Sequence, residues 1–291
     1  MRTYQAKPIR IEGNRKTLHN ICDVVRGCVG ARREAGGCYG SCYAMKMARM
    51  AGVDFSTPVP MILDSAALKR SLKRCKQRWI RVGVSGDPSL DWEKTVQVCE
   101  LIHEAGKIPV VITKGWKMIS EGQLVSFRRQ GTILHVSISG LDGWKLVNDR
   151  LDLIARYREA GGTPVIRLIS APFTGNKEEG IGYEGKPAWL QDQIITWARL
   201  YKVPILETPL RTFSTSRYVQ DGTIDSERLE KHVSPISGKF DGQLSAGRTI
   251  SGLRTGYCDT TCDKCPNQCM TTTTTDPRAL PVKVLLEIAG V

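Results

Sequence analysis

The chain has 291 residues, and its 42 Lys and Arg against 29 Asp and Glu give a formal net charge of +13. Hydrophobic residues make up 41% of it, enough to bury a sizeable core, and the charge favours polyanionic partners or anionic substrates. No apolar run reaches the roughly 20 residues that span a bilayer, and residues 1–12 lack the apolar core of a signal peptide. We therefore expect a cytoplasmic protein with no membrane association.

Strand and helix patterns alternate along most of the chain. In chain order they are strands 21–25 and 79–85, helix 92–105, strand 108–113, helix 123–129, strand 133–139, helix 144–160, strand 164–170, helix 189–201 and strand 203–207. Strands that alternate with helices at this spacing predict βαβ units and a parallel sheet. The predicted fold is α/β, a partial (β/α)6 TIM-like barrel over residues 1–210. A cysteine-rich iron–sulfur extension follows over residues 211–291.

Polar side chains occur with a period of two within the strands. In strand 133–139, His135, Ser137 and Ser139 lie on one face, whereas Leu134 and Val136 lie on the other. Helices should cover the apolar face, so the polar rows are expected to point into the barrel. They become more polar toward the carboxyl ends of the strands, where parallel barrels place their chemistry.

Seven of the ten cysteines fall into two tight groups, which argues against a secreted disulfide scaffold. The group near the N-terminus is Cys28, Cys38 and Cys42. The group near the C-terminus is Cys258, Cys262, Cys265 and Cys269. Converging thiolates suit an iron–sulfur cluster or a zinc ion, so we expect metal at both places. Cys22 is an alternative ligand, whereas Cys75 and Cys99 are expected to be buried like hydrophobic residues.

Four segments at the strand ends, VSGDPS, VITKG, VSISGLDG and PVIRLI, resemble in this order segments of the radical S-adenosylmethionine (radical SAM) superfamily. Ser85-Gly86-Asp87-Pro88 is similar to that family's glycine-glycine-glutamate-proline motif, which holds the methionine amino group. The resemblance covers about residues 28–207. The family usually carries C-x3-C-x2-C, whereas here the spacing is Cys28-x9-Cys38-x3-Cys42. The run GCVGARREAGGCYGSCYA also resembles a phage-associated branch whose cysteine loop ends in Cys-Tyr-Ala.

The resemblance implies that Cys28, Cys38 and Cys42 hold three irons of a 4Fe-4S cluster. The fourth iron would chelate S-adenosylmethionine. An electron from a reductant such as flavodoxin or ferredoxin would then cleave this cofactor to a 5'-deoxyadenosyl radical, which abstracts hydrogen from substrate. Asp87 would accept from the methionine ammonium, and Arg167 would pair with the carboxylate. The cofactor-binding residues implied in this way are Tyr43, Ser85, Gly86, Asp87, Ser137, Ser139 and Arg167.

Other residues have two interpretations each. Lys114 and Trp116 are candidates for the substrate pocket, or else a solvated lysine and a packed tryptophan. His135 and Glu207 are candidates for substrate or proton contacts, or else satisfied interior groups. The C-terminal cysteines are expected to hold a second, auxiliary 4Fe-4S cluster, with structural zinc as the alternative.

Basic residues form two groups. Lys69, Arg70, Lys73, Arg74, Lys76 and Arg78 precede the second strand, as a solvated face or a grip on nucleic acid. Arg10, Arg15, Lys16, Arg32 and Arg33 lie nearer the cysteine loop and are better candidates for anionic substrate. We expect a radical SAM enzyme acting on nucleic acid or a nucleotide-like substrate. The alternatives are a radical SAM peptide- or protein-modifying enzyme and a non-catalytic, metal-stabilised nucleic-acid-binding protein.

Overall fold

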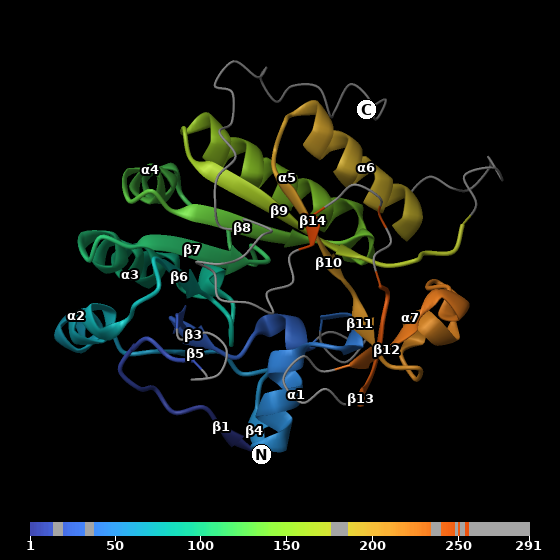
Figure 1. The fold of residues 1–291 in the computed structure, drawn as a ribbon, viewed down its shortest axis with the longest axis horizontal. Coiled ribbons are helices and arrows are strands. Elements are labelled where there is room, and N and C mark those ends of the chain that lie inside the picture. Colours follow the sequence, from blue (N-terminus) through green and yellow to red (C-terminus); the bar gives the residue numbers. More distant parts are fainter. Residues whose placement is uncertain are drawn as a thin grey trace.

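The centre of the molecule is a seven-stranded parallel sheet (Figure 1). The computed structural model describes residues 1–13, 20–32, 38–175, 186–233, 240–247, 250 and 254–255. The strands lie in the order β14-β10-β9-β8-β7-β6-β2, and every neighbouring pair is parallel. Their bounds are β2 Ile21–Cys22, β6 Trp79–Val82, β7 Ile108–Thr113, β8 Ile133–Ile138, β9 Thr163–Ser170, β10 Ile205–Pro209 and β14 Arg254–Thr255.

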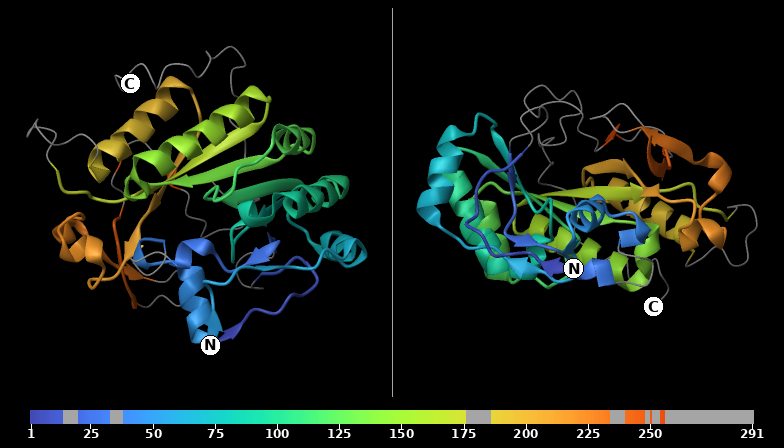
Figure 2. Two further views of the ribbon diagram at one scale, coloured as in Figure 1. Left: turned by 180° about the vertical axis from the view of Figure 1, so that it is seen from behind. Right: turned by 90° about the horizontal axis from the view of Figure 1, so that it is seen from below.

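Helices cover one face of this sheet. They are α3 Trp92–Glu104, α4 Glu121–Arg129, α5 Gly143–Glu159 and α6 Pro187–Leu200, each of which connects two strands. From β2 to β10 the strands follow the chain order across the sheet, and right-handed crossovers between such neighbours place all the helices on the same side. Figure 2 shows these helices gathered on that side. The prediction of a parallel α/β sheet flanked by helices is confirmed.

The two faces of the sheet carry different side chains. Ile80, Val82, Leu134 and Val136 belong to the main apolar core beneath the helices. On the opposite face, one layer of buried apolar side chains crosses the amino-terminal half of the sheet. It consists of Trp79, Val110, Ile133, Val165 and Leu206, one from each of five adjacent strands. This layer fills the amino-terminal half of the open face, the face without the connecting helices. A cavity on that face therefore lies nearer the carboxyl ends of the strands.

The residues before β6 form smaller elements that the strand pattern did not predict. Helix α1 (Tyr43–Met50) and helix α2 (Ser65–Arg74) are joined by short strands. β1 (Arg2–Thr3) pairs with β4 (Val53–Asp54), and β3 (Val25–Arg26) pairs with β5 (Val59–Pro60). The basic run 69–78 starts in α2 and enters β6 at its amino end as predicted, and all six basic residues are exposed.

The chain after β10 packs beside the carboxyl ends of the strands. β11 (Arg211–Thr212), β13 (Phe240–Ser245) and β12 (Glu230–Val233) form an antiparallel sheet, with the short helix α7 (Arg217–Gln220) between β11 and β12. A small apolar cluster joins this part to the N-terminal cysteines. Its buried members are Tyr39, Ala171, Leu210, Ile224 and Ala246. The described part of the extension therefore packs on residues of the predicted barrel domain.

The predicted element bounds agree with the structure to within two residues at most ends. The largest differences are at the first strand, predicted as 21–25 but divided into β2 and β3, and at the second, which ends at Val82 rather than residue 85. Cys258, Cys262, Cys265 and Cys269 lie outside the described residues. None of the described helices has both the length and the apolar character needed to cross a membrane.

Candidate functional site

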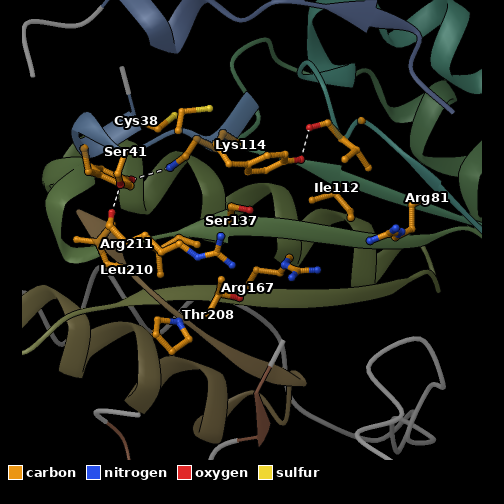
Figure 3. A pocket seen from close by; sticks show the side chains of 17 residues that line it. Cys38, Ser41, Arg81, Ile112, Lys114, Ser137, Arg167, Thr208, Leu210 and Arg211 are labelled. Carbon is orange, nitrogen blue, oxygen red and sulfur yellow. Dashed lines mark hydrogen bonds between the residues drawn. The ribbon is translucent and has the colours of Figure 1, made fainter. Parts of the chain in front are cut away.

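A cavity of about 400 Å3 lies on the open face of the sheet, at the carboxyl ends of the strands (Figure 3). Its lining comes from the sheet and from the cysteine loop, which we define as residues 27–42, described at 27–32 and 38–42. Strand residues and the turns after them contribute Arg81, Gly83, Val84, Ile112, Lys114, Ser137, Arg167, Ile169, Thr208, Pro209, Leu210 and Arg211. The cysteine loop and the start of α1 contribute Cys38, Tyr39, Ser41, Cys42 and Tyr43.

Strand register explains why the polar row reaches this cavity. Ser137 is paired with Arg167 across β8 and β9, so both side chains lie on the same face. Arg167 follows the buried Val165 by two residues and therefore projects from the open face, just beyond the apolar layer. The predicted positions of Ser137 and Arg167 at the strand ends are thus matched by a cavity that both residues line.

The cysteine loop begins where the chain passes close to β6. Gly27 has φ +85°, and a Cβ there would lie 2.7 Å from the carbonyl oxygen of Thr57. Its N–H donates to the carbonyl of Ser85 at 3.2 Å. Gly86 is equally constrained, because a Cβ there would lie 2.2 Å from the carbonyl oxygen of Val25. These two glycines allow the backbone before Cys28 to lie directly against the turn after β6.

The three thiols of this loop are close neighbours. A Cβ placed on Gly30 would lie 3.2 Å from Cys38 Sγ and 3.4 Å from Cys28 Sγ, so both sulfurs face the same small volume. Cys42 immediately precedes α1 and lines the cavity together with Cys38. Cys28 lies behind them and is 8% exposed. The loop therefore brings Cys38 and Cys42 to the cavity wall, with Cys28 close to Cys38 but outside the lining.

Burial opposes ionisation of the Cys28 and Cys42 thiols. Desolvation, with smaller contributions from Asp87 and Cys38, raises the pKa of Cys28 to about 12. The pKa of Cys42 is also raised by burial and by Cys38, while the N–H groups of Met45 and Ala44 and the Lys114 ammonium act in the opposite direction. Cys28 and Cys42 are therefore favoured as neutral thiols in the metal-free chain. A bound metal centre would stabilise the thiolates, so binding would release protons.

A buried ionic network fixes the cavity wall beside Cys38. Tyr39 has a left-handed backbone (φ 61°) and donates its hydroxyl proton to Asp142. Lys114 Nζ donates to the Tyr39 hydroxyl at 2.6 Å and lies 3.4 Å from Asp142 Oδ1. Arg150, on α5, forms an ion pair with the other oxygen of Asp142. The network joins the cysteine loop to the ends of β7 and β8 and to a covering helix.

Asp142 is the centre of this network. Its side chain is 1% exposed, and desolvation alone would raise its pKa. Lys114 and Arg150 outweigh that effect, helped by the hydroxyl of Tyr39, and lower the pKa from 3.8 to about 2. The same surroundings raise the pKa of Tyr39 well above its ordinary value, first by burial and then by the Asp142 charge. Asp142 is therefore an anion and Tyr39 a neutral donor at neutral pH.

Asp87 lies in the turn after β6, as predicted, and its carboxylate binds groups of the protein itself. Its carboxylate does not line the cavity. Oδ1 accepts from Ser89 N at 3.0 Å, Ser89 Oγ at 2.6 Å and Thr113 Oγ1 at 2.6 Å, and Oδ2 accepts from Lys114 N at 2.7 Å. The side chain thus caps the turn after β6 and braces the end of β7. This use differs from the predicted contact with a methionine ammonium.

Ser85, Gly86 and Ser139 also serve the backbone rather than the cavity wall. The N–H of Ser85 donates to Asp23 at 2.9 Å, and Gly86 provides the close approach to Val25. Ser139 is fully buried, and its Oγ accepts from Leu141 N at 3.3 Å. None of these three lines the cavity, so their predicted contact with the cofactor is not reproduced.

The structure separates His135 and Glu207 from the cavity. His135 is fully buried, in register with Ile112 and Val165, and does not line the cavity. Glu207 is in register with Leu168 of the helix-side core, is fully buried and accepts from Ser170 Oγ at 2.7 Å. Pairing with Leu168 turns the Glu207 carboxylate toward the helix side of the sheet, whereas His135 lies on the open face below Ser137; the substrate roles of both residues stay predictions.

Other predicted residues divide between site and core. Lys114 and Tyr43 line the cavity. Trp116 instead packs beneath the cysteine loop, and its ring would meet a Cβ on Gly30 at 2.8 Å. Cys22 is fully buried in the helix-side core, like Cys99, and cannot serve as an alternative ligand there. Within the described residues, no three His, Cys, Asp or Glu side chains meet the spacing expected around a single metal ion.

Four contributors to the site were not among the predicted site residues. Arg81 and Arg211 line the cavity, while Tyr39 and Asp142 form the buried network at its edge. Arg81 was visible in the polar row of its strand. The sequence Ser139-Gly-Leu-Asp142 has the spacing of a capping box, which predicts that Asp142 bonds back to Ser139, and the structure contains this capping box. Compared with known protein families and with curated proteins, the chain has no match.

Proposed function

We propose that this protein is a radical SAM enzyme with a 4Fe-4S cluster on Cys28, Cys38 and Cys42. The observation that carries the proposal is the position of the cysteine loop. It follows the first strand of a parallel sheet and adjoins a cavity at the carboxyl ends of the strands. Carboxyl ends of parallel strands are where α/β barrel enzymes place their reacting groups.

The strand order supports a partial (β/α)6 barrel as the framework of this site. Six strands, β2 to β10, follow one another across the sheet, and the four described helices that connect β6 to β10 lie on one face. A barrel needs this arrangement, whereas a doubly wound sheet has helices on both faces. The apolar layer on the open face would then be the lower filling of the barrel interior.

The chemistry of the donor set fits an iron–sulfur cluster. Two thiols line the cavity and a third lies behind them, all from one loop. A cluster lies between its thiolates and holds them farther apart than a single ion does. With its cofactor bound, such a centre would supply the electron for reductive cleavage of S-adenosylmethionine to methionine and the 5'-deoxyadenosyl radical.

The chain's own residues would bind and orient the cofactor. Arg167 is the candidate partner for the methionine carboxylate, and Ser137 beside it is a candidate donor to the carboxylate or ribose. Lys114 and Tyr39 would hold the cysteine loop in place through Asp142. The apolar layer below would keep water from the reacting atoms.

The remaining parts of the proposal concern partners and the C-terminal cysteines. Cys258, Cys262, Cys265 and Cys269 are proposed to bind an auxiliary 4Fe-4S cluster. Flavodoxin or ferredoxin is the proposed reductant, and the cytoplasm the proposed compartment. These proposals follow from the cysteine spacing and the sequence resemblance.

Anaerobic reconstitution tests the proposal. Iron and sulfide are measured in the full chain, which is then incubated with dithionite and S-adenosylmethionine while 5'-deoxyadenosine is quantified by chromatography. Two clusters require about eight irons per chain. A variant with Cys28, Cys38 and Cys42 all replaced by Ala should lose about four irons and all 5'-deoxyadenosine. Cys75→Ala is the matched control, since that thiol is buried outside the loop.

Three results would contradict the proposal. They are absence of iron from the wild type, failure to form 5'-deoxyadenosine with full iron, and retention of the reaction by the triple variant. Stoichiometric zinc with only about four irons would instead assign the C-terminal site to structural zinc. Loss of activity in Cys75→Ala would point to a folding effect, and circular dichroism of both variants separates that outcome.

A further inference from the structure

The ends of five helices gather along the amino edge of the parallel sheet, away from the cavity. Three or four residues separate each helix from α2 to α6 from the strand that follows it, so the last turns lie where β6 to β10 begin. We define the basic edge as these last turns with the residues that lead into the strands, namely 71–78, 101–107, 126–132, 156–162 and 197–204. It contains eleven Lys and Arg against two Glu, and so carries nine of the thirteen net positive charges of the chain.

Neighbouring segments of the basic edge are in contact. Lys107 Nζ, after α3, donates to two backbone carbonyls of the segment after α2, both at 2.8 Å. A Cβ on Gly161, after α5, would lie 3.1 Å from Arg128 Nε of α4. Arg158, in the last turn of α5, donates to the carbonyl of Tyr201 after α6. Figure 1 shows α2, α3 and α4 side by side along this part of the molecule. The five helix ends therefore form one continuous surface.

Most cations of the basic edge have no carboxylate paired with them in the described part of the chain. Arg156 is an exception, because Glu121 and Asp152 pair with it. Of the two acids in the basic edge, Glu104 pairs with a lysine in the middle of α2 at 3.0 Å, and the exposed Glu159 offsets one positive charge. Eight cations are exposed and form no ion pair with a described residue, namely Lys73, Arg74, Lys76, Arg78, Arg128, Arg129, Arg199 and Lys202.

Helix dipoles explain part of this charge, because cations are favourable near the C-terminus of a helix. Lys202 needs a further reason. It follows α6 with φ 50°, and its N–H donates to the carbonyl three residues earlier. The same left-handed position with the same hydrogen bond follows α3, α4 and α5, where it is occupied by Gly106, Gly131 and Gly161. Glycine adopts this conformation without strain. The fold therefore keeps a cation at a position where glycine would be less strained.

The basic edge is much longer than a single phosphate group. From β6 to β10 it crosses four strand spacings of about 4.8 Å, or roughly 19 Å. The register staggers the starts of β7 and β8 by two residues and those of β9 and β10 by three, about 16 Å in all along the strands. The two ends are thus roughly 25 Å apart. Duplex DNA carries one charge per about 1.7 Å of its axis, so it presents about fifteen charges over this length.

We propose that the basic edge binds the phosphate backbone of double-stranded DNA. The structure describes all five segments, and none of their Phe, Tyr or Trp side chains is exposed, whereas single strands are bound by stacking on aromatic rings. None of their Ser, Thr, Asn or Gln side chains is exposed either, whereas duplex RNA is bound largely through its 2'-hydroxyls and phosphates. Lys and Arg contacts to phosphates hold a duplex without reading its sequence. The inference does not rest on the proposed function, and DNA bound at this edge leaves the cavity at the other edge open.

Fluorescence anisotropy of a labelled DNA duplex of mixed sequence, titrated with the purified full chain, tests this surface. Replacing Arg128 and Arg129 together by Gln should weaken binding about tenfold at low salt. It should also lower the slope of log affinity against log salt by nearly two, because each phosphate contact contributes about 0.9 to that slope. Lys202→Gly should weaken binding about threefold and raise the urea midpoint, since it removes a charge and relieves the left-handed backbone.

Replacing Lys117 and Lys145 together by Gln is the matched control. It removes two exposed charges at the opposite ends of the same helices, since Lys117 precedes α4 and Lys145 lies in the first turn of α5. The control should bind DNA as the wild type does. An equal loss in the control, binding that does not change with salt, or loss of both binding and stability in Lys202→Gly would overturn the inference. So would tighter binding of a single strand, an RNA duplex or phosphatidylserine vesicles than of duplex DNA.

Discussion

Replacing Asp142 by Asn should strongly destabilise the fold. The carboxylate is buried between Lys114 and Arg150, whose charges lower its pKa from 3.8 to about 2. That shift alone corresponds to about 2 kcal/mol of stability at neutral pH. The substitution also leaves Arg150 buried without its anion, which raises the expected loss to about 3–5 kcal/mol. We therefore expect Asp142→Asn to lower the free energy of unfolding by about 3–5 kcal/mol.

Urea unfolding of the metal-free chain measures this loss. Asp149→Asn, in α5 next to Arg150, is the control, since its ion pair with Lys145 is exposed and should contribute less than about 0.5 kcal/mol. The pH dependence has a definite sign. Because the pKa of Asp142 is lowered by folding, its contribution is present above pH 3.8 and is lost as the pH falls toward 2. Equal stability of the Asp142→Asn and Asp149→Asn variants would refute the reasoning.

Three further variants or measurements test the cysteine loop and the turn beside it. Gly86→Ala should destabilise the chain by about 1–3 kcal/mol, because the added Cβ would meet the carbonyl of Val25. Gly122→Ala in α4 is the control and should be neutral or stabilising, because there is open space around Gly122. Similar urea midpoints for the two variants would contradict this expectation. Cys28 in the metal-free chain should react with iodoacetamide about a thousandfold more slowly at pH 8 than a thiol of pKa 9.0, because burial raises its pKa to about 12. Mass spectrometry measures this rate. A rate typical of an exposed thiol would count against the buried geometry. Asp87→Asn should lower stability by about 1–3 kcal/mol through lost contacts within its turn, and unchanged stability with weakened S-adenosylmethionine binding would return this residue to the cofactor site.

The sheet and the approximate position of the site could be predicted because period-two patterning reports which face a strand residue occupies. Ser137 and Arg167 line the cavity for this reason. Glu207 shows where the rule fails. The pattern predicts a strand end at 207, but β10 continues to Pro209, and pairing with Leu168 places Glu207 on the helix side. The face depends on register between strands, which a single segment does not contain.

The network at the cavity edge depends on contacts distant in sequence. Tyr39 and Asp142 are 103 positions apart, and Arg150 reaches them from a helix on the other side of the sheet. The sequence around Tyr39 contains no pattern that predicts its left-handed backbone or its contact with Asp142. Asp87 was placed by its resemblance to a family motif, but its position after a strand equally suits a cap for the following turn.

The order of the strands also has a consequence for synthesis on the ribosome. From β6 to β10, each strand pairs with the one made just before it, so the nascent chain can extend its sheet one unit at a time. β14 is the exception, because it is made after the antiparallel strands and pairs back onto β10. Until residues 254–255 emerge, none of the described strands made earlier pairs with this edge of β10, which is then open to strands of other chains. Truncation before this point should therefore increase aggregation of newly made protein.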